Sequence, residues 1–173
     1  MRRMPRWGMV CCVTLEWVAL AVWVGGMIVL SGAVIPAVFN TFGGQDSGGM
    51  FLTRAFEGYH RFVIGASGIL AVTLLGRWWS GEARAMVSVS ETIILAIMVV
   101  IAGLIILVLH PEAAVLQTQA FTTKDEGAKK AAFEAFFRVL LPIRALYMVN
   151  LALGLLLIGI KAKRMLDDDG RPS

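Results

Sequence analysis

Four long apolar segments constrain this chain more than any other feature of its sequence. A bilayer core about 30 Å thick is crossed by about 20 apolar residues in an α-helix, which rises about 1.5 Å per residue. Segments of suitable length and composition cover residues 12–39, 60–79, 92–109 and 139–160. We therefore predict an all-α protein that forms a four-span transmembrane helix bundle, with residues 1–173 as a single integral membrane domain.

The composition agrees with this prediction and excludes an ordinary water-soluble monomer. Hydrophobic residues make up 58% of the chain and charged residues 16%, against about 45–50% and about 25% in soluble domains. The net charge of +4 does not indicate nucleic acid as a partner, because the 16 Lys and Arg are spread over the chain ends and the loops. In such positions they orient a membrane protein.

The charge distribution also predicts a topology. Four spans place both ends of the chain on one side of the membrane, with nine Lys and Arg on that side and seven on the other. By the positive-inside rule we expect cytoplasmic termini in a bacterial inner membrane. The first apolar segment is longer than the apolar region of a signal peptide, about 7–15 residues, so we predict that it is a retained span.

Two stretches with similar sequences indicate an internal repeat. Residues 55–61 and residues 132–138 share Ala-Phe-Glu and a closing Arg, and they are 77 positions apart. Each stretch precedes an apolar segment, and each follows a segment that ends near a proline, Pro36 or Pro111. We therefore predict two parallel hairpin repeats related by a pseudo-twofold axis along the membrane normal.

Amphipathic segments flank the second and fourth spans. We expect the helix of the second span to begin within residues 51–61, and we expect residues 111–138 to form a surface or re-entrant helix pair. Each repeated stretch contains a glutamate four residues before an arginine, a spacing that predicts interfacial pairs worth about 0.2–0.5 kcal/mol each. These pairs are Glu57 with Arg61 and Glu134 with Arg138.

Glu16 lies inside the first predicted span, and Arg144 and Asn150 lie inside the fourth. An ionisable residue in a span costs about 2.5–3.5 kcal/mol, so Glu16 and Arg144 are candidates for function. Both lie near the end of a span, so their charged groups could instead reach the lipid headgroups. We expect Asn150 to form an interhelical hydrogen bond, and Arg144 and Asn150 could line a path between the hairpins.

The only two histidines, His60 and His110, fall at the same ends of neighbouring spans. Glu57 precedes His60 by three residues, a spacing found in the metal sites of helical bundles, so His60, His110 and Glu57 are candidate metal ligands. The alternative is a pair of interfacial histidines in contact with headgroups. No phosphate-binding, nucleophile-elbow or zinc-protease motif occurs, so we expect no catalytic residues and no enzymatic activity.

Small residues recur where close helix contacts would stabilise a membrane bundle. We expect such contacts at one face of each of the first three spans, formed by Ala21, Gly25 and Gly32, by Gly65 and Gly68, and by Ala102 and Gly103.

The string Trp23-Val-Gly-Gly26, followed by Pro36-Ala-Val-Phe39, resembles the transmembrane protein 205-like family, a bacterial and eukaryotic domain of unknown function. The likeness covers nearly the whole chain and implies a four-span bundle with Asn150 in the last helix. The first span also looks like that of copper-resistance D-type membrane proteins, where a histidine precedes a similar string. Glu16 occupies that position here, and a glutamate is a poor axial ligand for haem.

These observations predict a structural or interaction role, in contact with lipid and with other membrane subunits or further copies of the chain. One alternative is a membrane protein that handles haem or copper, although we expect no resident cofactor. The other alternative is a small transporter.

Overall fold

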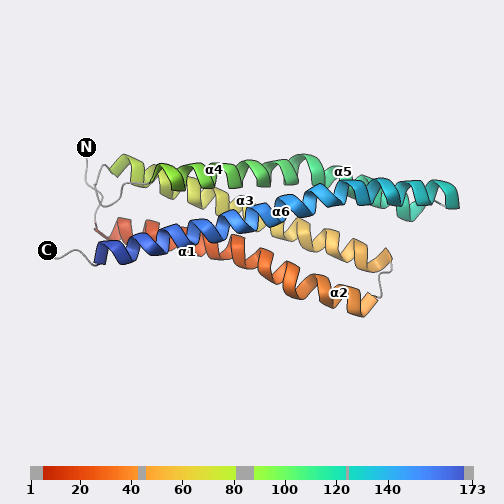
Figure 1. The fold of residues 1–173 in the computed structure, drawn as a ribbon, viewed down its shortest axis with the longest axis horizontal. Coiled ribbons are helices and arrows are strands. Elements are labelled where there is room, and N and C mark those ends of the chain that lie inside the picture. Colours follow the sequence, from red (N-terminus) through yellow and green to blue (C-terminus); the bar gives the residue numbers. More distant parts are fainter. Residues whose placement is uncertain (1–5, 43–45, 81–87, 124, 170–173) are drawn as a thin grey trace.

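The structure, a computed structural model, describes residues 6–42, 46–80, 88–123 and 125–169 (Figure 1). Within these ranges the chain is helical and contains no strand. Four helices are long and apolar enough to cross a membrane, over Trp7–Phe42, Gly48–Trp79, Val89–Thr122 and Gly127–Asp167. The predicted four-span helical bundle is therefore confirmed.

Each half of the chain has the same order of elements. In the first half, α1 (Arg6–Val29), the π-helix η1 (Leu30–Val34) and α2 (Ile35–Phe42) follow one another directly and precede α3 (Asp46–Ser80). In the second half, α4 (Val89–Leu104), the π-helix η3 (Ile105–Leu109) and α5 (His110–Thr122) precede α6 (Glu126–Asp169). The two π-helices lie 75 residues apart, which supports the predicted hairpin repeat.

A proline follows each π-helix, at Pro36 and at Pro111. Proline has no N–H to donate, and its ring collides with a carbonyl of the preceding turn. A wider π turn at that point accommodates the ring, so the helix continues instead of ending. The helix that contains each of these apolar segments therefore extends past its proline.

The segments next to the spans also differ from their predictions. The second long helix, α3, begins at Asp46, before residues 51–61. Residues 111–138 do not form a separate surface pair, because α5 continues directly from η3 and α6 runs without interruption from Glu126. They instead lengthen two spanning helices, which pack against each other.

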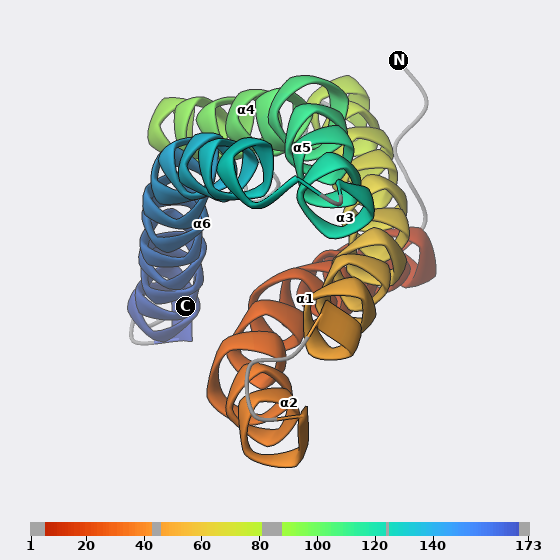
Figure 2. The ribbon, with the colours of Figure 1, turned by 90° about the vertical axis from the view of Figure 1, so that its right-hand side faces the viewer.

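The four long helices surround a common axis (Figure 2). The start of α1, the end of α3, the start of α4 and the end of α6 lie at one end of the bundle, here named the terminal end (Figure 1). The end of α2, the start of α3 and the junction of α5 with α6 lie toward the opposite end, the hairpin end. Helix α1 packs on α3 and α6, while α4 packs on α6.

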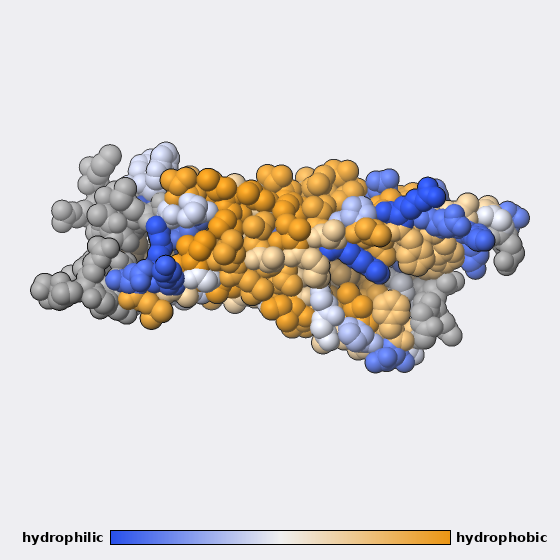
Figure 3. All heavy atoms as spheres, viewed as in Figure 1, coloured by the Kyte–Doolittle hydropathy of each residue, from blue (hydrophilic) through white to orange (hydrophobic). Residues whose placement is uncertain are grey.

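Apolar side chains fill the middle of the bundle and also cover its outside. Leu20, Met98, Ile105 and Leu157 are the largest fully buried side chains of the described residues. Figure 3 shows hydrophobic residues over the central part of the molecule and hydrophilic residues nearer both ends. An apolar band with polar ends is the surface that a bilayer requires.

Tryptophans mark the terminal end of this band. Trp7, Trp78 and Trp79 are each at least 80% exposed, although they are large and apolar. Such residues concentrate where lipid headgroups meet hydrocarbon.

Of the small residues predicted to form close contacts, Ala102 is buried in the core, whereas the others are not in close contact inside the bundle. A Cβ added at Gly25, Gly32, Gly65, Gly68 or Gly103 would meet nothing within 4 Å, and Ala21 is exposed. Helix periodicity groups residues on a face but does not say whether that face points inward. Close approach occurs instead at Gly26, against the Tyr59 ring, and at Gly154, against Val24 and Met98.

Candidate functional site

Five charged side chains gather at the terminal end of the bundle; we call them the terminal ion-pair network. The carboxylate of Glu16 accepts hydrogen bonds from Arg77 Nη1, at 2.8 and 3.1 Å, and from Lys161 Nζ. The carboxylate of Glu91 accepts a hydrogen bond from Arg164 Nη1 at 2.9 Å and lies 4.0 Å from Lys161 Nζ. Glu16 and Glu91 are each only 3% exposed.

This network connects α1, α3, α4 and α6. Both glutamates are buried and paired, so Glu16 does not reach toward the headgroups. A buried carboxylate persists only when charged partners compensate for its lost hydration, and here each partner comes from another helix. The arrangement therefore fixes how the helices meet, and it leaves neither carboxylate exposed for chemistry.

Sequence reasoning missed Glu91 because this residue lies just outside the predicted span of residues 92–109. The spacing of the internal repeat nevertheless points to Glu91. Glu91 follows Glu16 by 75 residues, the same spacing that separates Pro111 from Pro36. The repeat therefore predicts a second buried glutamate once the first is known.

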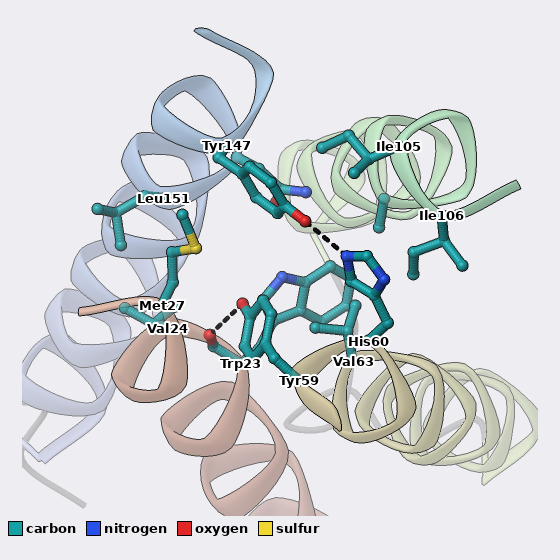
Figure 4. A pocket seen from close by; sticks show the side chains of 12 residues that line it. Trp23, Val24, Met27, Tyr59, His60, Val63, Ile105, Ile106, Tyr147 and Leu151 are labelled. Atoms are coloured by element: carbon teal, nitrogen blue, oxygen red, sulfur yellow. Dashed lines mark hydrogen bonds between the residues drawn. The ribbon is translucent and has the colours of Figure 1, made fainter. Parts of the chain in front are cut away.

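A second group of polar side chains lies between the two hairpins; we call Tyr59, His60, His110, Tyr147 and Asn150 the central cluster. His60 Nε2 and the Tyr147 hydroxyl are 2.5 Å apart and share a hydrogen bond. The rings of His60 and His110 are edge to face, with centroids 4.6 Å apart. The Tyr59 hydroxyl donates to the Trp23 carbonyl at 2.8 Å, as Figure 4 shows.

Asn150 completes the central cluster from α6. Its Nδ2 group donates to the Met98 carbonyl at 3.2 Å, which is the interhelical hydrogen bond that the sequence predicts. Its Oδ1 atom is buried and has no partner. Asn150 therefore has one satisfied and one unsatisfied polar group inside the bundle.

A small cavity lies beside these side chains, with a volume of about 20 Å³. Five of its lining residues are polar or aromatic with a polar group, namely Trp23, Tyr59, His60, Tyr147 and Asn150, and most of the others are aliphatic. The π-helix η3 contributes Ile105 and Ile106 to the wall (Figure 4). π-Helical turns are frequent at functional sites, so this cavity is the best candidate for one.

The structure brings the two predicted histidines together, but it does not assemble the predicted metal ligands around them. His60 is only 5% exposed, so the alternative of two headgroup-exposed histidines does not describe it. Glu57 and Glu112 are exposed. Over the residues that the structure describes, no group of three or more His, Cys, Asp or Glu side chains could hold a metal ion.

Other predicted site residues lie away from the cavity. Arg144 is exposed and does not line the cavity, so the predicted path along Arg144 and Asn150 is not present. The exposed pairs Glu57–Arg61 and Glu134–Arg138 are not formed, since the ion pairs of the described residues all involve Glu16 or Glu91. Holding two long exposed side chains together costs entropy that water-screened attraction barely offsets.

Tyr59 and Tyr147 are the functional candidates that sequence reasoning missed altogether. Tyr59 lies in an amphipathic stretch and Tyr147 in a largely apolar one, so each looks like an interfacial or core aromatic residue. Both hydroxyl groups make buried hydrogen bonds, as buried tyrosines usually do. The repeat offers no help here, because no tyrosine occupies the matching position of the other half.

Comparison with known proteins identifies one family. Residues 18–122 match the model of a family described as a domain of unknown function, DUF4149. No curated protein and no solved structure matches the chain.

Proposed function

We propose that this chain, which belongs to the DUF4149 family of unknown function, has a structural or interaction role, as a non-catalytic subunit that contacts other membrane helices. Its four apolar helices fit a multi-pass membrane protein. The observation that carries the proposal is a helix face of α3 that has glycines but no contact inside the bundle.

This face, here named the glycine face, consists of Gly58, Gly65 and Gly68. A Cβ added at any of the three would meet nothing within 4 Å. Glycine is unfavourable in helix interiors, by about 1 kcal/mol relative to alanine in soluble helices, and nothing inside the bundle requires it here. Glycines on one face allow the backbone of a second membrane helix to approach closely. The glycine face therefore supports a contact with a helix outside this bundle.

The filled interior supports an interaction role over transport. Leu20, Met98 and Leu157 are fully buried between the terminal ion-pair network and the central cluster. The cavity beside the central cluster is only about 20 Å³. A transported solute needs a polar path through the bundle, and the described residues do not form one.

Association should therefore depend on the glycine face. Introducing Gly65→Leu with Gly68→Leu is expected to weaken association about tenfold, equivalent to about 1.4 kcal/mol, because two large side chains keep the other helix away. The measurement is native mass spectrometry after gentle extraction from membranes, in which the unaltered chain should appear in species heavier than its own 18.8 kDa.

The matched control is Gly159→Leu, at a position of α6 that is equally open. It should leave the association unchanged. A lone monomer for the unaltered chain would contradict the proposed role, and equal loss in the control would exclude the glycine face as the contact.

We further propose that the chain is of the transmembrane protein 205-like type and lies in a bacterial inner membrane with cytoplasmic termini. The Trp23–Gly26 string and the four-span layout support the first statement. The excess of Lys and Arg at the terminal end supports the second.

Metal handling is a second candidate, because His60 and His110 lie in contact inside the bundle. A haem group does not fit. The edge-to-face ring contact leaves no space for a porphyrin between the histidines, and His60 Nε2 is already hydrogen-bonded to Tyr147. In α1, Glu16 is ion-paired to Arg77 where haem-binding relatives of this architecture would need a histidine.

The imidazoles of His60 and His110 would offer a copper ion two ligands of a type that copper favours. If the chain handles copper, the purified protein should carry it or bind added Cu(I), and a variant with His60→Phe and His110→Phe should lose it. Metal analysis that finds no copper before or after loading would eliminate this candidate.

A further inference from the structure

The central cluster contains two buried polar atoms without a partner. They are Asn150 Oδ1 and His110 Nε2. Asn150 is 5% exposed, so bulk solvent does not satisfy its carbonyl oxygen. An unsatisfied buried acceptor is costly, and a hydrogen-bond donor placed against it would recover that cost.

The cavity beside Asn150 has room for such a donor. A water molecule needs about 10–15 Å³ of accessible cavity volume and two to four polar partners. The cavity provides about 20 Å³, and its wall includes Asn150, Tyr147, His60 and Tyr59. An apolar ligand the size of one aromatic ring needs a cavity of about 150 Å³, so the space selects a much smaller molecule.

The hydrogen-bonding groups on the wall suit a water in particular. Asn150 Oδ1 can only accept, so it needs an O–H or N–H donor. The Tyr147 hydroxyl has one donor and two lone pairs, and its bond to His60 uses only part of that capacity. A water can donate to Asn150 and still exchange a second hydrogen bond with Tyr147.

Access to this position differs between the two ends of the bundle. Toward the terminal end, Leu20, Met98 and Leu157 are fully buried and form an apolar layer. Toward the hairpin end, His60 contacts His110, which is only partly buried and lies at the start of α5. Glu57, which precedes His60 by three residues on α3, is exposed. Among the residues that the structure describes, polar side chains therefore adjoin the cavity on the side of the hairpin end.

We infer that the central cluster binds one water molecule between the two hairpins, and that water reaches this position from the hairpin end of the bundle, past His60 and His110. The inference does not depend on the glycine face or on any partner.

Water-edited solid-state NMR of the ¹⁵N-labelled protein in lipid bilayers tests this inference. Magnetisation from water should reach the side-chain nitrogens of Asn150 and His60 in the unaltered chain. Tyr147→Phe keeps the ring but removes the hydroxyl, and Asn150→Leu removes the acceptor, so each should reduce the transfer to His60 at least twofold. His110→Phe should slow hydrogen–deuterium exchange of the Asn150 amide about tenfold.

The matched control is Thr73→Val, which removes a buried hydroxyl of α3 whose hydrogen bonds go to carbonyls of its own helix. It should leave the water transfer and the exchange rate unchanged. The inference is overturned if the unaltered chain shows no transfer to Asn150 or His60. It is equally overturned if the transfer survives both Tyr147→Phe and Asn150→Leu, or if His110→Phe leaves the exchange rate unchanged.

Discussion

Replacing Glu16 with glutamine is expected to lower the free energy of unfolding by about 3–5 kcal/mol, the cost of removing one partner from a buried ion pair. Glu16 is 3% exposed and accepts hydrogen bonds from Arg77 and Lys161. Glutamine keeps the size of the side chain but removes the charge that these two cations face. Reversible unfolding in mixed detergent micelles measures the change.

Two further variants make the result specific to the network. Glu57→Gln removes an exposed carboxylate that has no ion pair, and it should change the unfolding free energy by less than about 0.5 kcal/mol. Combining Glu16→Gln with Arg77→Met should cost less than the sum of the two single changes, because the two groups interact directly. A loss below about 1 kcal/mol for Glu16→Gln would mean that the network does not hold the helices together.

Replacing Gly154 with alanine is expected to destabilise the bundle by about 1–3 kcal/mol, the usual cost of overpacking a filled core. A Cβ at this position would lie 2.6 Å from Val24 Cγ2 and 3.3 Å from the Met98 methyl group. Both neighbours are themselves buried, so α1, α4 or α6 must shift to make room. The same unfolding experiment measures this change.

Gly159→Ala provides the comparison within the same helix. A Cβ at Gly159 would meet nothing within 4 Å, so the substitution should leave stability unchanged or raise it slightly through helix propensity. Equal losses at Gly154 and Gly159 would contradict the contact of α6 with α1 and α4.

The sequence alone predicts the class of fold, because hydrocarbon leaves a chain with apolar segments of this length few choices other than helices. It also predicts the repeat, through the two Ala-Phe-Glu stretches, and the interhelical hydrogen bond of Asn150. These predictions depend on composition and periodicity, which can be read along the chain. They do not require knowing which face of each helix points toward the other helices.

The central cluster and the inward-facing glycines could not be predicted for that reason. In a soluble protein, polarity tells the buried face of a helix from the exposed one, but a lipid-facing residue is as apolar as a core residue. Gly65 and Gly154 therefore look alike in the sequence, although one is open and the other is in tight contact. Because of the same ambiguity, the sequence suggested a path lined by Arg144 and Asn150, whereas Arg144 lies on the outside of the bundle.

The most direct test of a four-span bundle is side-specific labelling of single cysteines in a chain whose Cys11 and Cys12 have been replaced. Trp7→Cys, Asp125→Cys and Met165→Cys place one exposed thiol each at the start of α1, before α6 and near the end of α6. A membrane-impermeant maleimide should react with the first and third from one side of the membrane and with Asp125→Cys from the other. Reaction of Trp7→Cys and Met165→Cys from opposite sides would contradict the fold.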